Sequence, residues 1–545
     1  MKYVKEMSMS QFTLIDWVVL VVYFLSMAVM GPLFAHRGKS TEGYFLGGRS
    51  YPGWLIGLSM FATSISSITF VAYPADAYKT AYLRFLLCLM LPVGVYLASL
   101  IFLPFYRKAG IVSAFEYLEG RFGTGTRAYA AIAFIVGQLI RISLILYLVS
   151  LLVYEMTHLN PYLCVLIGGI VTSFYTVLGG IEAVIWTDFI QSFLLWAGGF
   201  VCLGMVLYSI PGGVGTVIRE AVADGKFMLG DLNTATGVLE PAKWGFSLSE
   251  KTILMMLLMG VAQWLTEYSS NQNVIQKYVA TKSEKDAFSA IWICCLCSVP
   301  TWGFFMFLGT SLYVYYKIFP DAQAQAMLMG QAKAEQILPY FVIKVLPTGL
   351  SGLVIAGVLA AAMSSLSSSI NAISAVSIVD IYKRHLVKGH SDQHYVWTAK
   401  IISIMSSVVM IVGALLLLIA ESKTLQDTAT KLASITGGGL LGLYVLGFMT
   451  RRGDGRAVFV GIIVTVLFST YIALIELKVI SRNLFMDWGL SEGISKTLAQ
   501  PIDTYYAGLM GNIIIFAIAY LLAITLLPEK PRDLKNLTVW TRNSK

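Results

Sequence analysis

A run of serines inside an otherwise apolar stretch is the clearest chemical feature of this sequence. Residues 360–369 read AAAMSSLSSS. On a helix Ser364, Ser367 and Ser368 share one face, and Ser365 lies beside it. Hydroxyl oxygens are suitable ligands for a hard cation. Small residues and serines also let helices pack closely, so the run alone leaves ion binding and packing both open.

Two further features could complete an ion site. Residues 62–69 read ATSISSIT within a second apolar stretch, and an unwound helix there would expose the carbonyls of Ala62 and Ile65. Such carbonyls, together with nearby hydroxyls, bind Na⁺ in transporters with broken helices. Asp188 lies just inside another apolar stretch, where its carboxylate could balance a bound cation. Polar packing and a solvated helix end are the respective alternatives.

Arg141 falls near the centre of an apolar span. An arginine at that depth costs about 2.5–3.5 kcal/mol on insertion scales, so some interaction must offset the cost. A carboxylate substrate would do so, because the guanidinium group binds carboxylates in a bidentate manner. A permanent structural pairing with Glu267 or with carbonyls is the alternative. Glu267 itself could also contact substrate or carry a proton.

The elements that carry these residues are apolar spans. Of the 545 residues, 57% are hydrophobic and only 13% are charged, whereas soluble domains carry about 25% charged residues. Hydropathy predicts an all-α membrane protein with about thirteen transmembrane helices. The predicted spans are 12–34, 54–75, 84–106, 127–154, 160–178, 183–208, 252–272, 287–316, 349–379, 398–420, 429–449, 456–476 and 504–527.

The distribution of basic residues predicts the orientation. One set of short connections carries most of the lysines and arginines, and it includes the connection with Lys277, Lys282 and Lys285. Short basic loops face the cytoplasm. We therefore expect a protein of the plasma membrane, the inner membrane in a bacterium, with its N-terminus outside the cell and its C-terminus in the cytoplasm. The net charge of +9 then reflects orientation, and we expect the lipid bilayer as partner and no nucleic acid.

The spans also suggest an internal symmetry. The spans form two blocks, residues 54–208 and 252–476, each with five spans in its core. Because five is an odd number, the second block starts from the opposite face of the membrane and is inverted relative to the first. An N-terminal helix at 12–34, a C-terminal helix at 504–527 and a cytoplasmic tail at 528–545 complete a single transporter domain. Inverted repeats of this kind carry broken helices and a midplane binding site. The polar runs at 62–69 and 263–272 predict that the first helix of each block is interrupted.

The same residues resemble the sodium:solute symporter family over about residues 12–527. The motifs are YFLGGR at 44–49, GGIEAVIWTD at 179–188 with Gln191, and the serine run followed by DIYK at 380–383. Within that family the chain is most similar to bacterial Na⁺/sialic acid symporters, through FATSISSITF at 61–70 with Pro74, Ala75, Ala77 and Tyr78. The resemblance implies a LeuT-like inverted five-plus-five repeat.

The resemblance also implies specific sites. A first Na⁺ site falls on Ala62, Ile65, Ala361, Ser364 and Ser365. A second Na⁺ site falls on Asp188, Ser364, Ser367 and Ser368. The substrate pocket falls on Ser64, Ser66, Thr69, Arg141 and Asn271. The chain departs from the family pattern at Cys88, where the sialic acid transporters carry a glutamine, and at Arg84, where an aromatic residue is usual.

The function implied is Na⁺-coupled import of a small organic solute, an acidic sugar such as sialic acid, by alternating access. One or two Na⁺ ions would drive it. A symporter for a neutral sugar or another organic solute is the alternative within transport, and a membrane sensor or channel is the alternative outside it. An enzyme is not expected, because the sequence shows no nucleophile–base pair or metal-binding cluster.

Overall fold

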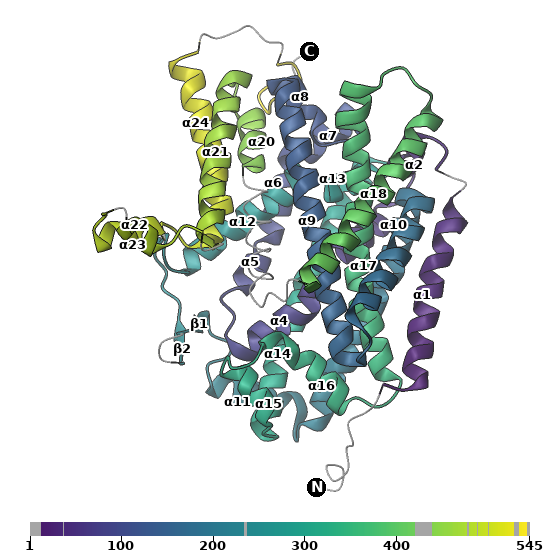
Figure 1. Ribbon diagram of the computed structural model, residues 1–545, viewed down its shortest axis with the longest axis vertical. Coiled ribbons are helices and arrows are strands. Elements are labelled where there is room, and N and C mark those ends of the chain that lie inside the picture. Colours follow the sequence, from purple (N-terminus) through teal and green to yellow (C-terminus); the bar gives the residue numbers. More distant parts are fainter. Residues whose placement is uncertain are drawn as a thin grey trace.

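The computed structural model describes residues 12–35, 38–233, 237–419, 439–476, 479–487, 489–499, 501–527 and 534–541. The first ten residues of the predicted span 429–449, and parts of the predicted tail 528–545, lie outside these ranges. Within them the protein is a bundle of helices that run mostly along one direction (Figure 1).

The long helices are α1 (Leu14–Phe34), α9 (Thr124–Thr157), α10 (Pro161–Ser209), α14 (Glu284–Ile318), α17 (Leu350–Val376), α18 (Asp392–Ile419), α21 (Gly455–Glu476) and α24 (Ala507–Thr525). Two pairs of helices follow one another across a short break: α3 (Gly53–Ser64) with α4 (Ser67–Lys79), and α12 (Ile253–Ser270) with α13 (Gln272–Val279).

The shorter helices are α2 (Thr41–Leu46), α5 (Phe85–Leu89), α6 (Leu91–Ile101), α7 (Leu103–Ala109), α8 (Glu116–Phe122), α11 (Gly213–Ala223), α15 (Ala322–Leu328), α16 (Ile337–Val345), α20 (Leu440–Met449), α22 (Arg482–Asp487) and α23 (Glu492–Ala499). Single turns of 3₁₀ helix are η1 (Gly47–Arg49), η2 (Ala334–Gln336) and η4 (Thr504–Tyr506), and η3 (Ser377–Leu386) is a π-helix that continues α17. A small hairpin pairs β1 (Gly230–Leu232) with β2 (Leu239–Pro241) in antiparallel register.

Eight helices of the described residues are long and apolar enough to cross a membrane, and the bent pair α3–α4 makes nine. A multi-pass membrane protein is therefore confirmed, whereas the count of thirteen spans stays a prediction. The predicted spans 160–178 and 183–208 are joined in the 49-residue helix α10. At 1.5 Å per residue, α10 is far longer than a hydrocarbon core of about 30 Å. Gly180 interrupts it with φ 57° and ψ −147°, between the two predicted spans.

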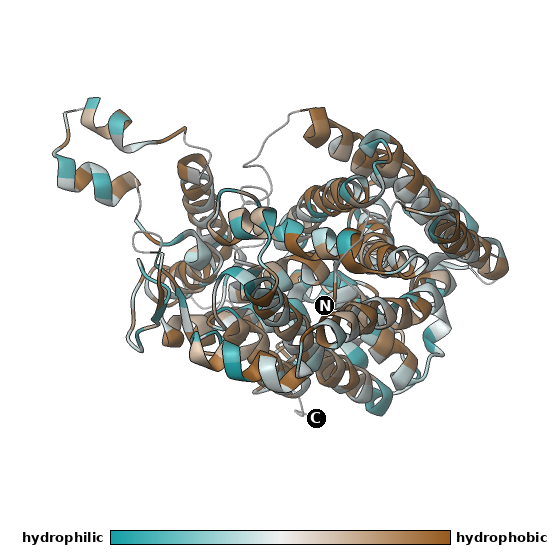
Figure 2. Cartoon of the chain, turned by 90° about the horizontal axis from the view of Figure 1, so that it is seen from below, coloured by the Kyte–Doolittle hydropathy of each residue, from teal (hydrophilic) through white to brown (hydrophobic). Residues whose placement is uncertain are grey.

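Helix α17 is the centre of the bundle. It packs against α10, α9, α1 and α18, and 94% of its most apolar stretch is buried inside the protein, against 22% for α1. The outward faces of α1, α18 and α21 expose large aliphatic side chains such as Val21, Val408 and Leu467. These helices therefore present the apolar surface that a bilayer requires, and brown hydrophobic colouring predominates along most helices in Figure 2.

The two predicted interruptions are confirmed. Helix α3 ends at Ser64, and Ile65 is extended with φ −94° and ψ 102° before α4 begins. Helix α12 ends at Ser270, and Asn271 is extended with φ −84° and ψ 109°. The Asn271 side-chain oxygen accepts a hydrogen bond from the backbone amide of Asn273 at 3.0 Å and so caps α13. Serine and asparagine favour such breaks because their side chains bond to nearby backbone groups.

The two described ends of the chain lie at opposite ends of the bundle (Figure 1). At the end that carries β1, β2, α11, α15 and α16, the Asp16 carboxylate of α1 accepts the amides of Gly349 at 2.9 Å and Gly352 at 2.7 Å. At the other end, beside α8, the amide of Val539 donates to the Phe448 carbonyl at 2.9 Å. This arrangement agrees with the prediction that the two termini lie on opposite sides of the membrane. Which side faces the cytoplasm stays a prediction.

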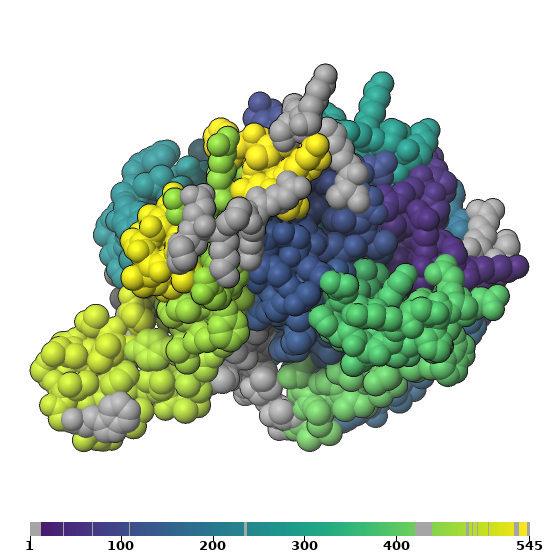
Figure 3. Space-filling model, turned by 90° about the horizontal axis from the view of Figure 1, so that it is seen from above, coloured from purple at the N-terminus to yellow at the C-terminus, as the bar shows by residue number. Residues whose placement is uncertain are grey.

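One part of the structure extends away from the bundle. Helices α22 and α23 follow α21 and form a lobe that projects at one edge of the molecule (Figures 1 and 3). Both helices are short, and α23 carries several exposed polar residues. The functional residues predicted from the sequence lie elsewhere, in the packed part formed by α3, α4, α9, α10, α12, α13 and α17.

The break in α10 gives a test of the fold. A Cβ added at Gly180 would lie 2.7 Å from the Tyr44 carbonyl oxygen, and its φ of 57° disfavours any side chain. We expect Gly180→Ala to lower stability by about 1–3 kcal/mol, measured as a lower apparent melting temperature of the detergent-solubilised protein. Gly204→Ala in the same helix is the control, because a Cβ there meets no atom within 4 Å. Equal melting temperatures for the two variants would contradict this account.

Candidate ion and substrate site

The broken end of α3 lies against the serine run of α17. The Ser364 hydroxyl donates to the Ala62 carbonyl at 2.9 Å and to the Ala361 carbonyl at 3.1 Å. The Ser365 hydroxyl donates to the Thr63 carbonyl at 3.2 Å. The last carbonyls of a helix have no partner within the helix, so the end of α3 must find donors elsewhere. The serines of α17 supply them.

This junction has the chemistry of a cation site. Carbonyl and hydroxyl oxygens from Ala62, Ala361, Ser364 and Ser365 converge within hydrogen-bonding distance, and all four residues are buried. Ile65, the remaining predicted ligand, is fully buried in the extended link itself. A hard cation could replace the hydroxyl protons as the partner of these oxygens. The structure therefore brings the residues of the first predicted Na⁺ site together.

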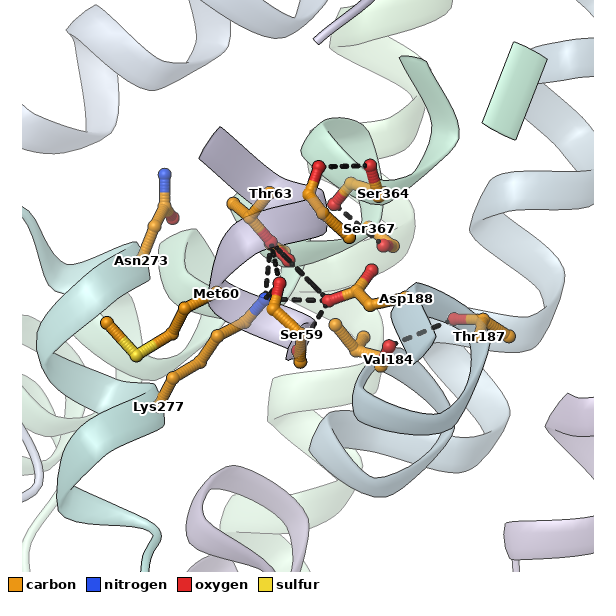
Figure 4. Close-up of polar contacts among 12 residues, drawn as sticks. Ser59, Met60, Thr63, Val184, Thr187, Asp188, Asn273, Lys277, Ser364 and Ser367 are labelled. Atoms are coloured by element: carbon orange, nitrogen blue, oxygen red, sulfur yellow. Dashed lines mark hydrogen bonds and ion pairs between the residues drawn. The ribbon is translucent and has the colours of Figure 1, made fainter. Parts of the chain in front are cut away.

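Asp188 is the centre of a second cluster, which Figure 4 shows. Its Oδ2 atom accepts hydrogen bonds from Ser59 at 2.7 Å, Thr63 at 3.4 Å and Ser368 at 3.5 Å. Ser364 and Ser367 lie on the adjacent part of α17, where the Ser367 hydroxyl donates to the Ser364 carbonyl at 3.2 Å. The structure thus places the residues of the second predicted Na⁺ site around one region of α17.

Lys277 enters that second cluster, and its predicted location was wrong. Lys277 was expected in a cytoplasmic connection, but it lies on α13, is 1% exposed, and forms an ion pair with Asp188 at 2.6 Å. The error arose because the predicted span 252–272 was ended at residue 272, where polar residues begin and the hydropathy falls. A signal was present, because Asn271 is a good N-cap for a helix that starts at the next residue.

The other polar side chains of α13 are also buried and paired. Asn273 donates to Gln138 on α9 and to Ser369 on α17, both at 3.3 Å. Gln276 donates to Asn371 on α17 at 2.6 Å. Buried polar groups need such partners, so the polar composition of α13 reflects packing against α9 and α17. Gln138, Asn273 and Gln276 were not singled out from the sequence.

The predicted substrate residues lie on three elements. Ser64, Ser66 and Thr69 surround the break between α3 and α4, and the Ser64 hydroxyl donates to the Met60 carbonyl at 3.0 Å. Asn271 forms the second break, and its side-chain amide donates to both carboxylate oxygens of Glu267 at 2.9 Å. A cavity of about 100 Å³ next to the first break is lined by Ser67, by α9 and by residues 333–339.

Arg141 lies on α9, one turn beyond Gln138. It is partly buried and makes no ion pair or hydrogen bond to any other residue that the structure describes. Pairing with Glu267, the alternative left open by the sequence, is not observed among the described residues, where Glu267 instead accepts from Asn271. The guanidinium group of Arg141 is therefore available to an anion from outside the chain.

The two positions that depart from the family pattern are already engaged. Arg84 forms ion pairs with Asp76 and, at 3.4 Å, with Asp231 of β1. The Cys88 thiol lies 3.1 Å from the Tyr73 hydroxyl. Nearby, Lys226 donates to the last carbonyls of α4, including that of Tyr78 at 2.7 Å, and burial lowers the pKa of Lys226 to about 7. These contacts hold α4, the second half of the first broken helix, in place.

Comparisons with known proteins identify relatives across nearly the whole chain. The model of the sodium:solute symporter family matches residues 44–465. The sodium/sialic acid symporter SiaT of Proteus mirabilis is 30% identical over 500 residues, which cover 91% of this chain and 96% of that protein. The sodium/sialic acid symporter NanT of Aliivibrio fischeri is 28% identical, over 84% of this chain and 88% of that protein.

A solved structure has a similar fold. It is described as the substrate-bound outward-open state of a Na⁺-coupled sialic acid symporter, with a novel Na⁺ site. It matches with a TM-score of 0.80 and 28% sequence identity, and the match covers 95% of this chain and 100% of that chain. The similarity therefore extends over the core helices that carry the two oxygen clusters.

Proposed function

We propose that this chain, which belongs to the sodium:solute symporter family, imports an acidic sugar of the sialic acid type together with Na⁺. The observation that carries the proposal is the junction between the broken end of α3 and the serines of α17, where backbone and hydroxyl oxygens converge. Its relatives are symporters, so the chain is a transporter and no enzyme. Na⁺ is its coupling ion.

We propose a LeuT-like inverted repeat for the architecture, with residues 54–208 and 252–476 as the two blocks and about thirteen spans in all. The breaks at Ile65 and Asn271 support this symmetry, because each falls in the first helix of a block. The remaining parts are a helix at 12–34, a helix at 504–527 and a tail at 528–545. In a bacterial inner membrane the N-terminus would lie outside and the C-terminus in the cytoplasm.

The first Na⁺ site would couple the ion to the conformation. Ala62 and Ile65 belong to the first block, whereas Ala361, Ser364 and Ser365 belong to the second. An ion held by both sets stabilises one relative position of the blocks and thereby favours the outward-open state that admits substrate. Each Na⁺ that moves through 100 mV supplies about 2.3 kcal/mol, and a monocarboxylate substrate that moves with it opposes this voltage term by the same amount per negative charge.

The substrate would bind between the two breaks and α9. Ser64, Ser66 and Thr69 offer hydroxyl groups, and Asn271 offers an amide oxygen beside its bond to Glu267. Arg141 would bind the carboxylate of the sugar acid, because its guanidinium group has no partner among the described residues and an arginine at the depth of a membrane span needs an anion. This free arginine favours an acidic sugar over a neutral one.

The ion site predicts a change in Na⁺ dependence. We expect Ser364→Ala and Ser365→Ala to raise the Na⁺ concentration for half-maximal uptake in proteoliposomes about tenfold each, since one ligand oxygen bound to a charge contributes about 1.5 kcal/mol. Ser407→Ala is the control, because that buried hydroxyl bonds, among the described residues, only within α18, to the Ser403 carbonyl at 2.8 Å. An unchanged Na⁺ dependence in both site variants would exclude this site.

The proposed substrate site predicts that uptake of sialic acid is lost when Arg141 is replaced. Arg141→Ala should reduce sialic acid uptake at least about 100-fold, because two charge-assisted hydrogen bonds contribute about 3 kcal/mol or more. Arg141→Lys should restore only part of the uptake, since lysine lacks the fork. Arg219→Ala, at a largely exposed arginine, is the control. Full uptake by Arg141→Ala would make the arginine structural and favour a neutral sugar.

A further inference from the structure

The ion pair between Asp188 and Lys277 determines how many Na⁺ ions the protein can carry. We infer that the Lys277 ammonium permanently takes the place of the second Na⁺, so that each substrate moves with one Na⁺. If the substrate is the monocarboxylate sugar proposed above, on which this inference rests, transport is then electroneutral. One positive and one negative charge cross the membrane together.

The contacts of Lys277 match those of a bound cation. An ammonium group has three donors, and the structure uses all of them: Asp188 Oδ2 at 2.6 Å, the Ser59 carbonyl at 3.1 Å and the Thr63 hydroxyl. Both charged side chains are buried, with 1% exposure for Lys277 and 0% for Asp188. The ammonium group therefore uses all three donors inside the protein and neutralises the carboxylate away from solvent.

The charge balance argues against a second ion in addition to the lysine. The other predicted ligands, Ser364, Ser367 and Ser368, are neutral, so Asp188 is the only formal negative charge of that site. The ammonium of Lys277 cancels this charge. A Na⁺ ion added beside it would be a buried charge without a counter-ion, and such charges are strongly disfavoured.

The geometry of an ion site is nevertheless retained. Asp188 Oδ1 is buried and has no hydrogen-bond partner in the part of the chain that the structure describes. The Ser368 hydroxyl lies 3.5 Å from the other oxygen, and Ser364 and Ser367 lie on the adjacent part of α17 (Figure 4). If the lysine lost its charge, this cluster would become an unpaired carboxylate surrounded by hydroxyls. Removal of Lys277 should therefore create a second Na⁺ site.

The pair also differs from a Na⁺ ion in one functional respect. It joins α10 to α13 and, through Ser59 and Thr63, to α3. A Na⁺ ion at this position would leave the protein in each cycle, but a lysine stays attached to its helix. Each substrate is then driven by the concentration gradient of a single Na⁺. The membrane potential contributes nothing when the substrate carries one negative charge.

The test measures stoichiometry and voltage dependence in proteoliposomes. Uptake of ²²Na⁺ and of labelled sialic acid is followed while K⁺ and valinomycin set the membrane potential. For the unchanged protein we expect one Na⁺ per substrate, a Hill coefficient near 1 for Na⁺, and an uptake rate that is the same at 0 and −100 mV.

Variants then assign the effect to the lysine. In Lys277→Met, the ratio of Na⁺ to substrate should rise toward two and the Hill coefficient for Na⁺ should approach 2. Uptake by this variant should be faster at −100 mV than at 0 mV. Lys277→Arg, which keeps the charge, should behave like the unchanged protein. Lys285→Met is the matched control, because Lys285 is exposed at the start of α14. It should leave the stoichiometry and voltage dependence unchanged.

Two results would overturn the inference. One is a ratio of two Na⁺ per substrate in the unchanged protein, which needs no variant and so decides the matter even if Lys277→Met fails to fold. The other is a folded, active Lys277→Met that still carries one Na⁺. Neither result affects the proposed function, which fails only if sialic acid uptake by the unchanged protein does not depend on Na⁺.

Discussion

The structure depends on one constraint: every backbone amide and carbonyl inside the hydrocarbon of a membrane needs a partner within the protein. A helix that breaks there leaves carbonyls without partners, and the break between α3 and α4 does so at Ala62 and Thr63. The hydroxyls of Ser364 and Ser365 bond to those carbonyls. This need explains why α17 is both rich in serine and almost wholly buried at the centre of the bundle. The same oxygens that stabilise the break form the proposed Na⁺ site.

Much of this could be predicted from the sequence, because polar residues in an apolar window are conspicuous. The serine run, the broken helices at 62–69 and 263–272, and the multi-pass character were all predicted in this way. The predicted division between spans 160–178 and 183–208 coincides with Gly180, whose positive φ interrupts α10. Lys277 was misplaced because a helix made of buried polar residues resembles a loop when only hydropathy is considered. Its partner Asp188 is 89 residues away in the sequence.

The two oxygen clusters of α17 differ in charge, and this difference gives them different roles. The cluster at Ala62 and Ser364 consists of neutral dipoles, so it can accept and release a cation without leaving an unpaired anion. The cluster at Asp188 carries a full negative charge, and Lys277 neutralises it within the chain. Removal of one partner from a buried ion pair is strongly destabilising. A resident lysine therefore also protects the packing between α3, α10 and α13 throughout the transport cycle.

The most direct test of the central claim is a pair of cryo-electron microscopy structures of the protein, one prepared in NaCl and one in KCl. The account predicts a density peak in NaCl, absent in KCl, between the carbonyls of Ala62 and Ala361 and the hydroxyls of Ser364 and Ser365. Identical maps at this junction in both salts, with the serine hydroxyls still bonded to the carbonyls, would contradict it.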